Sequence, residues 1–200
     1  MSRYSGHDYY LDPASGVLKN RLGIADAATL EQTEADFAAA RSRELSQNPL
    51  KGRFDLAHLQ TLHRYLFGDV YEWAGQLRTV DIGKGGHLFA HHAHIANAAE
   101  PIFKQLAEEQ HLAGLAPAAF SDRAAHYLGE LNALHPFREG NGREQREFVS
   151  HLAQATGYYI AWENVTQQDM LEASIQSFKG ETSKLAAIIR ENLRSLDRDG

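Results

Sequence analysis

The chain has no cysteine, and only 5 of its 200 residues are proline. The missing cysteine excludes disulfide bonds, thiolate nucleophiles and zinc sites with cysteine ligands. No segment reaches the roughly 18 consecutive apolar residues that a membrane-spanning helix needs, and the first residues lack the apolar centre of a secretory signal peptide. We therefore expect a cytoplasmic protein that does not associate with membranes.

The chain also lacks a surplus of basic residues. Its 20 Lys and Arg residues face 26 Asp and Glu residues, so the formal net charge is −6. A negative surface repels polyanions, so we expect no direct nucleic-acid partner and at most a local phosphate site. With 43% hydrophobic and 23% charged residues, the composition is that of a globular chain with a real core.

Apolar residues recur at helical spacing along most of the chain, which predicts a largely helical protein. We expect helices at residues 29–45, 56–67, 95–110, 117–134, 143–156, 167–178 and 185–196. Residues 77–89 alternate with period two around Gly-Lys-Gly-Gly, which indicates a β-hairpin. No repeat or linker divides the chain. The sequence thus predicts an all-α fold, a helical bundle of about seven or eight helices with a small β-hairpin, as a single domain over residues 1–200.

The sequence also predicts how two of these helices begin and end. Thr29 and Gln32 have the pattern of a capping box at the start of the first helix, with Phe37 on its buried side. Asp55 is expected to cap the second helix, and Gly68 is expected to end it in a left-handed conformation.

The densest group of chemically useful side chains is HPFREGNGREQR, residues 135–146, between two expected helices. Gly140 and Gly142 can adopt positive φ and let backbone N–H groups approach an anion. The helix that begins near Arg143 adds unpaired N–H groups and a partial positive charge. Arg143 and Arg146 share one face of its first turn. We interpret the segment as an anion cradle. Pairing of the two arginines with Glu144, Glu147 or other acids is the structural alternative.

Two further side chains of this segment suit phosphoryl chemistry. Glu139 offers a hard carboxylate oxygen beside the cradle, as Mg²⁺ needs when it keeps several waters, and a solvated loop acid is the alternative. His135 has an imidazole whose ordinary pKa suits a general base at neutral pH, acting on a hydroxyl that attacks phosphorus. Phe137 is expected to point inward and anchor the loop.

A histidine cluster and a glycine-rich tip precede this segment. His87, His91 and His94 would suit a transition-metal site, as in a metallohydrolase, although a hairpin there disfavours it. Lys84, at the tip of the expected hairpin, can reach a phosphate or expose the hairpin edge to a peptide, and a plain turn is the alternative. Neither glycine segment has the P-loop or Rossmann fingerprint, so both of these nucleotide-binding folds are excluded.

Residues 135–146 closely resemble the signature of the Fic family: His-Pro-Phe, an acidic residue, Gly-Asn-Gly-Arg, and a second arginine three residues on. The resemblance extends to YEWAGQLR and VDIGKGGHLFA upstream, which are similar to the segment leading into the flap hairpin of the family. It covers about residues 50–195. The resemblance therefore implies a Fic fold with its core there and a helical N-terminal extension over residues 1–49.

The resemblance implies a protein adenylyltransferase, which moves AMP from ATP onto a hydroxyl side chain of a target protein with Mg²⁺ as cofactor. His135 would activate the hydroxyl, and Glu139 would hold Mg²⁺. The residues implied to bind the nucleotide phosphates are Gly140, Asn141, Gly142, Arg143 and Arg146. The residues implied to dock the target, by adding a strand to the flap, are Lys84, Gly85 and Gly86.

Other members of the family keep alternatives open. Relatives with lysine in place of the last glycine phosphorylate their targets, and the intact Gly142 favours AMP here. A Fic-fold kinase, transfer of another nucleotide, and a non-catalytic nucleotide-binding module are the competing readings.

The resemblance also bears on regulation. Many Fic proteins are restrained by a helix with the pattern (S/T)xxxE(G/N), and this chain has only near matches, at residues 177–181 and 195–200. We therefore expect a small separate antitoxin to carry the inhibitory helix, as in bacterial toxins that modify DNA gyrase and topoisomerase IV.

Overall fold

The computed structural model describes residues 8–84 and 86–196, and of His87 only the backbone. Seven α-helices lie in this part of the chain, which confirms the expected all-α fold. They are α1 (Ala27–Gln47), α2 (Leu56–Phe67), α3 (Ile95–Glu108), α4 (Pro117–Leu134), α5 (Asn141–Ala155), α6 (Gln167–Phe178) and α7 (Ser183–Asn192). Short 3₁₀ turns, η1 (His92–His94), η2 (Gln110–Leu112) and η3 (Trp162–Asn164), lie between them.

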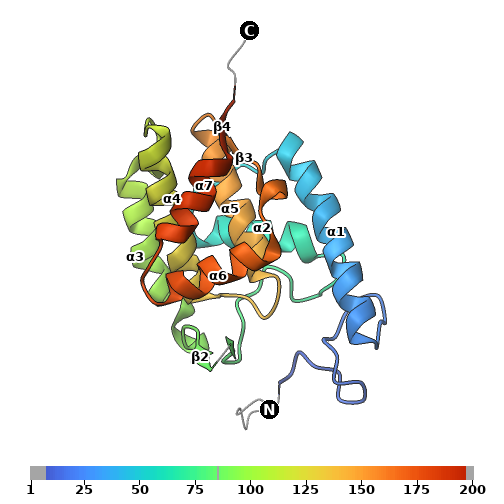
Figure 1. Cartoon of the computed structure of the whole chain (residues 1–200). Helices are drawn as coiled ribbons and strands as arrows, with labels where there is room; N and C mark the ends of the chain where they lie inside the picture. The colour runs from blue at the N-terminus through green and yellow to red at the C-terminus, as the bar shows by residue number, and fades with distance from the viewer. Residues whose placement is uncertain (1–7, 85, 197–200) are drawn as a thin grey trace.

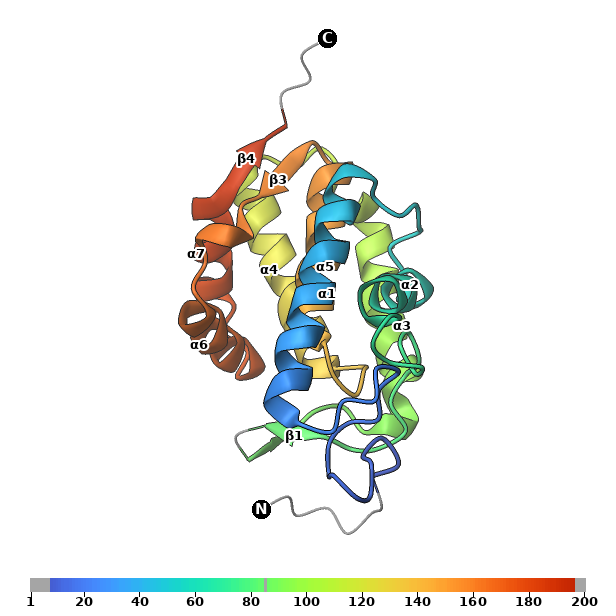
Figure 2. The same cartoon turned by 90° about the vertical axis from the view of Figure 1, so that its right-hand side faces the viewer.

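Helices α4 and α5 form the centre of the bundle (Figures 1 and 2). Helices α6 and α7 cover one side of this pair, and α2 and α3 cover the opposite side. Helix α1 packs against α2. A single hydrophobic core joins all of them, with Leu45 of α1, Phe67 of α2, Leu106 of α3 and Phe148 of α5 almost or completely buried. Helix α1 therefore shares the core of the helices that follow it.

Two short antiparallel sheets complete the described fold. Strands β1 (Gly83–Lys84) and β2 (His87–Leu88) form the expected hairpin, although each has only two residues. We call residues 83–88 the flap. Strands β3 (Tyr158–Ile160) and β4 (Leu193–Ser195) form the other sheet. The predicted last helix was too long, because the chain leaves α7 at Asn192 to pair with β3, a strand far away in sequence.

Helix α1 begins earlier than predicted. Asp26 is its N-cap, and one carboxylate oxygen of Asp26 accepts hydrogen bonds from the backbone N–H (2.8 Å) and the hydroxyl (2.6 Å) of Thr29. The buried side of the helix is centred on Glu34 and Ala38. Phe37 falls at its edge and stays 37% exposed, so its expected burial was wrong.

The predicted cap of α2 is confirmed, and its predicted end is not. Asp55 accepts a hydrogen bond from the backbone N–H of His58 at 2.9 Å. Gly68 has φ −65° and ψ −23°, a right-handed conformation. Glycine is needed there for space, because a Cβ would lie 2.6 Å from the carbonyl oxygen of Arg64.

Among the described residues, no helix combines the length and the apolar character that crossing a bilayer requires.

Candidate active site

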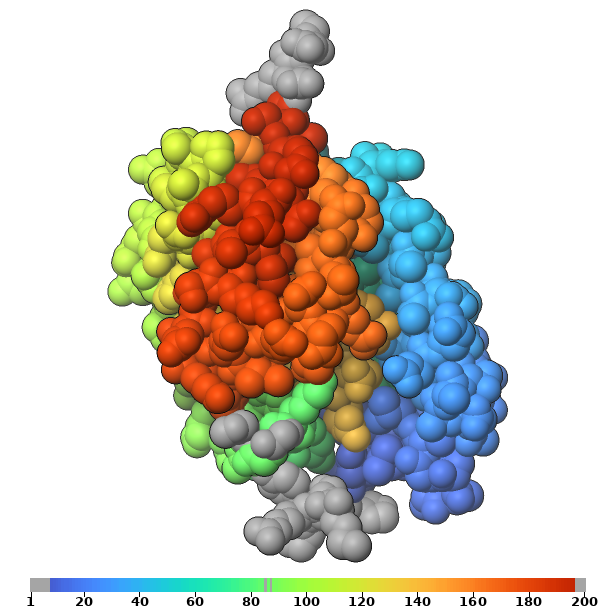
Figure 3. All heavy atoms as spheres, in the orientation of Figure 1, coloured from blue at the N-terminus to red at the C-terminus, as the bar shows by residue number. Residues whose placement is uncertain are grey.

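Residues 135–146 connect the C-terminal end of α4 to the first turn of α5. In Figure 3 this part of the chain, in gold, reaches the surface between the green flap region, the orange α6 and the blue α1. His135 is the C-cap of α4 and has a left-handed backbone, with φ 45° and ψ 63°. Such a conformation costs on the order of 1 kcal/mol for a residue other than glycine.

The hydrogen bonds of His135 fix which ring nitrogen carries its proton. Its Nδ1 lies 3.1 Å from the carbonyl oxygen of Asn132, and because a carbonyl only accepts, Nδ1 is protonated and Nε2 keeps a lone pair. Phe89 stacks on the imidazole, with ring centroids 3.7 Å apart and planes 9° apart. Burial lowers the pKa of His135 to about 4, and the positive charges of Arg78 and Lys84 also lower it. His135 is therefore a neutral base at pH 7.

The loop after His135 is held by two buried polar side chains. Asn141 accepts from the backbone N–H of Phe137 (2.9 Å) and donates to its carbonyl (2.8 Å). His63 accepts from the N–H of Gly75 at Nδ1 (2.9 Å), so its Nε2 carries the proton and donates to the carbonyl of Glu139 (2.9 Å). Phe137 is fully buried and stacks on His63 at 3.8 Å, which confirms its expected inward position. The side chain of Asn141 thus shapes the loop.

The two glycines of the motif differ in backbone conformation and in the space around them. Gly140, the N-cap of α5, has φ 80°, and a Cβ there would lie 2.5 Å from ring atoms of Phe67. Gly142 lies in the first turn of α5 outside the positive-φ region, so that part of the prediction was wrong. A Cβ at Gly142 would meet only the guanidinium of Arg146, at 4.0 Å. First-turn N–H groups have no acceptor within their own helix, so those of Asn141 and Gly142 can face an anion.

Arg143 forms an ion pair with Glu34, a carboxylate on α1 whose side chain is only 4% exposed. Glu34 also accepts a hydrogen bond from the hydroxyl of Tyr71. Burial raises the pKa of Glu34, and the nearby Arg143 opposes that rise. The alternative predicted from sequence, that an arginine of the motif pairs with an acid, therefore holds for Arg143, but the acid comes from a distant helix.

Arg146 lines the larger of two clefts that meet at Arg143. This cleft, about 470 Å³, lies between α1 and α5 and also has Ser42 and Ser150 on its walls. The smaller cleft, about 460 Å³, has Glu34, Tyr71 and Glu139 on its walls. Burial and the charge of Arg143 lower the pKa of Arg146, and among the described residues no carboxylate forms an ion pair with it. Its guanidinium is thus available to an incoming anion.

Glu139 has the surroundings that a magnesium ligand needs. Its side chain is exposed, and its Oε1 accepts a hydrogen bond from the N–H of Gly140 at 3.0 Å. It lines the smaller cleft beside Arg143. Mg²⁺ in nucleotide sites takes one or two protein carboxylates and fills the remaining positions with phosphate oxygens and water. A single exposed carboxylate next to an anion cradle fits that donor set.

The flap places Lys84 and Gly86 at an exposed tip, and Gly86 has φ 84°. Gly85, the third residue expected to dock a target, lies outside the described residues. Lys84 is close enough to His135 for its charge to lower the pKa of that imidazole. The structure thus brings the tip of the flap near the proposed base.

A buried arginine that no sequence pattern singled out ties the flap to His135. Arg78 is only 2% exposed, and its guanidinium donates to the carbonyls of His135 (2.8 Å), Val80 (2.8 Å) and Ala90. Val80 and Ala90 flank the flap on either side. An arginine in an alternating segment gives no sign in the sequence that it is buried, because its partners are backbone carbonyls.

The sequence disfavours a metal site at the histidines upstream of the motif. His94 is the N-cap of α3, and the side chain of His87 lies outside the part of the chain that the structure describes. Asp81, His91 and His92 form a group whose ligating atoms all lie within 4.8 Å of one another. Among the described side chains, the group that could hold a metal ion therefore contains a carboxylate and does not include His94.

Comparison with known proteins agrees with this geometry. The sequence model of the Fic/DOC family matches residues 53–153, which include the whole motif. The chain is 53% identical over 194 residues to the protein adenylyltransferase VbhT of Bartonella schoenbuchensis, covering 96% of this chain and 41% of VbhT. It is 40% identical over 187 residues to a Salmonella typhimurium protein named "Probable protein adenylyltransferase Fic", covering 93% and 92% of the two chains.

A solved structure has the same fold. The BepC protein of Bartonella tribocorum, crystallised with bound AMPPNP, superposes with a TM-score of 0.90 at 26% identity, over 96% of this chain and 99% of that one. The chain described here thus spans nearly all of the Salmonella relative but less than half of VbhT.

Proposed function

Because the chain belongs to the Fic/DOC family, we propose that it is a protein adenylyltransferase, which transfers AMP from ATP to a hydroxyl side chain of a target protein. The observation that carries the proposal is the state of His135, a neutral imidazole with its Nδ1 proton committed to Asn132 and its Nε2 lone pair free. The loop of residues 136–140 joins His135 to the N-terminus of α5, which is suited to binding phosphate. The AMPPNP bound to BepC supports a nucleoside triphosphate as substrate.

In this mechanism the Nε2 atom of His135 takes the proton of the target hydroxyl while the hydroxyl oxygen attacks the α-phosphorus of ATP. A bond forms between that oxygen and the α-phosphorus. The bond from the α-phosphorus to the bridging oxygen breaks, and pyrophosphate leaves with the electron pair. Before this step the carbonyl of Asn132 fixes the tautomer of the neutral imidazole, and the stacked Phe89 helps to fix its orientation.

The remaining motif residues bind and orient the triphosphate. The backbone N–H groups of Asn141 and Gly142, at the N-terminus of α5, face the phosphates, and Arg143 and Arg146 compensate the charge of the distal ones. Glu139 would hold Mg²⁺, which neutralises phosphate charge when bound. Asn141 contributes through its backbone, because its side chain is committed to Phe137.

The flap and the larger cleft suit two protein partners. Strand β1 (Gly83–Lys84) is exposed, and an extended target segment can add to the edge of this hairpin as a further strand. We assign the target to the class represented by DNA gyrase and topoisomerase IV, in the cytoplasm of a bacterium. We place an antitoxin helix with the pattern (S/T)xxxE(G/N) along the cleft between α1 and α5, where Arg146, which has no ion-pair partner among the described residues, can pair with the glutamate of that helix. We also infer that residues 1–49 belong to the same domain, since Leu30 and Leu45 share the core.

The position of the label in ATP tests the reaction type. The purified chain is incubated with Mg²⁺ and with gyrase or topoisomerase IV subunits, using ATP labelled at either the α- or the γ-phosphorus. Adenylyl transfer labels the subunit from α-labelled ATP only and adds one AMP to its mass. Label from the γ position would identify a kinase, and nucleotide binding without labelled protein in a full bacterial lysate would identify a binding module. Either result would overturn the proposal.

A further inference from the structure

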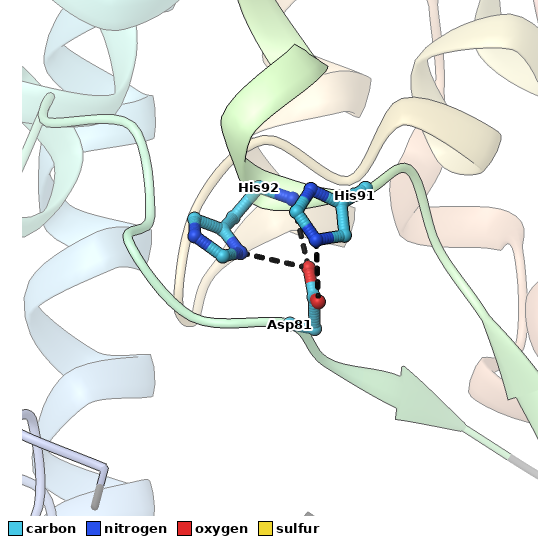
Figure 4. A group of neighbouring side chains, drawn as sticks. All are labelled: Asp81, His91 and His92. Atoms are coloured by element: carbon cyan, nitrogen blue, oxygen red, sulfur yellow. Dashed lines mark hydrogen bonds and ion pairs between the residues drawn. The ribbon is translucent and has the colours of Figure 1, made fainter. Parts of the chain in front are cut away.

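Asp81, His91 and His92 form a compact group at the base of the flap (Figure 4). Asp81 lies two residues before β1, and the histidines lie where the chain enters η1 and α3. The two rings face one carboxylate, which comes from the other side of the hairpin. Neither the proposed transfer nor the binding of ATP uses any of these three side chains.

The ring nitrogens and carboxylate oxygens of the group, which contact one another directly, are close enough together to share one ion. Nδ1 of His92 lies 3.0 Å from Oδ1 of Asp81, and Nε2 of His91 lies 3.2 Å from Oδ2. When a tetrahedral zinc ion binds its ligands at about 2.0–2.1 Å, neighbouring ligand atoms are about 3.3 Å apart. All the ligating atoms lie within 4.8 Å of one another, so small rotations of the two rings bring them around one ion.

The carboxylate of Asp81 is held in place by groups that do not compete for the metal. The backbone N–H of His92 donates to its Oδ1 at 2.8 Å. The buried guanidinium of Arg78 approaches the same oxygen at 3.7 Å. The hydrogen bond from the N–H of His92 orients the carboxylate, as the outer contacts of metal ligands do.

The group is open to ions from solution. The side chains of Asp81, His91 and His92 are 26%, 54% and 35% exposed. Water can complete the coordination shell, and His94 stands nearby, with its ring centroid 5.4 Å from that of His91. Two imidazoles with one carboxylate suit Zn²⁺ and other late transition metals, whereas Mg²⁺ and Ca²⁺ prefer all-oxygen sites.

We infer that Asp81, His91 and His92 form a binding site for a transition-metal ion of the Zn²⁺ class, which clamps together the two ends of the flap. Residues 82–90 lie between the ligands, and they include Phe89, which stacks on His135. A bound ion therefore restrains the segment that covers the proposed base. The inference rests on the geometry of the group alone and does not depend on the adenylyl-transfer activity.

Metal binding by the whole, untagged chain tests the site. The protein is stripped with a chelator and dialysed against Zn²⁺, and bound metal is counted by mass spectrometry. We expect one Zn²⁺ per chain, with an affinity that falls at least about tenfold in Asp81→Asn and in His92→Gln. His126→Gln, on α4 and away from the group, is the matched control and should bind as the wild type does. Hydrogen exchange should slow at the amides of residues 82–90 when Zn²⁺ is added to the wild type.

A loss of metal binding identifies a ligand only if the variant is still folded. Each is compared with the wild type in metal-free buffer by circular dichroism and thermal unfolding. Co²⁺ added to the wild type should give the intense visible absorption of a low-coordinate site, and Asp81→Asn should abolish it. Equal Zn²⁺ affinity in the folded wild type and in both variants, or no stoichiometric binding by the wild type, would overturn the inference.

Discussion

The buried carboxylate of Glu34 forms an ion pair with Arg143, 109 residues further along the chain. It joins α1 to the first turn of α5, where the phosphates of a nucleotide are expected. Tyr71 donates to the same carboxylate, so Glu34 is held by two partners. In the nucleotide-free chain, one of the two arginines of the motif is therefore already occupied by an internal anion.

Removing this anion should strengthen nucleotide binding. The neutral side chain in Glu34→Gln still accepts from Tyr71 but no longer competes with phosphate for Arg143. We expect the Kd for ATP to fall roughly three- to tenfold, about 1 kcal/mol, measured by calorimetry. Glu31→Gln, an exposed change on the same helix and the same cleft wall, controls for net charge. Weaker binding by Glu34→Gln would mean that Glu34 serves to position Arg143.

The depressed pKa of His135 predicts an unusual pH profile. A base must be neutral to accept a proton, so transfer should decline only as the pH falls towards about 4. Between pH 7.5 and pH 5, kcat/KM should therefore change little. A histidine with an ordinary pKa would be about 3% neutral at pH 5 and would lose activity roughly thirtyfold. A loss of that size, in a protein shown to remain folded at pH 5, would contradict the burial assigned to His135.

Glu144 should limit the stability of the protein at neutral pH. It is completely buried, among the described residues neither of its oxygens has a hydrogen-bond partner, and burial raises its pKa well above the ordinary value. Below the pKa that Glu144 has in the unfolded chain, its carboxyl is protonated in both the folded and the unfolded protein. Above it, the unfolded carboxyl ionises while the folded one stays neutral, so stability is lost as pH rises.

The substitution Glu144→Gln removes this pH-dependent loss. We expect the variant to gain on the order of 1–2 kcal/mol over the wild type at pH 8 and much less at pH 4.5, measured by denaturant unfolding. The exposed change Glu191→Gln should shift neither value appreciably. A gain for Glu144→Gln that is independent of pH would show that Glu144 is already ionised in the folded protein.

Arg78 should matter for both stability and transfer. In Arg78→Met, the carbonyls of His135, Val80 and Ala90 lose their donor, which should cost about 3 kcal/mol or more. The loss of the cation should also raise the pKa of His135. Thermal unfolding and the pH profile measure the two effects, with the exposed Arg53→Met as control. Unchanged stability would show that water replaces the guanidinium.

Local sequence patterns predicted most of the fold. The N-cap of α2 at Asp55 and the end of α4 at Leu134 depend on neighbouring residues, and the structure confirms both. The pairing of β3 with β4 depends on segments far apart in sequence, so the last helix was predicted too long. The N-cap of α1 was misplaced because Asp26 and Thr29 both belong to residue types that cap helices, and periodicity alone does not choose between them.

The motif at residues 135–146 was the most predictable part of the site, because its chemistry is contiguous in sequence. Glu34 and Arg78 could not be identified from the sequence. The acid reaches its partner Arg143 across the bundle from α1, and Arg78 bonds to backbone carbonyls. The role of the Asn141 side chain was also hidden, because its two hydrogen bonds return to Phe137 within the same loop. Such contacts arise only when the chain is folded.

The most direct test of the account separates nucleotide binding from transfer at His135. The variant His135→Asn removes the base, and asparagine tolerates the left-handed backbone found there. Single-turnover transfer of AMP from α-labelled ATP to a gyrase or topoisomerase IV subunit is measured at saturating nucleotide. The control is His126→Asn, a change within α4.

The account predicts ATP binding within about twofold of the wild type and transfer reduced by roughly a hundredfold or more in His135→Asn, with His126→Asn unaffected. Transfer by His135→Asn at a rate close to that of the wild type would contradict it.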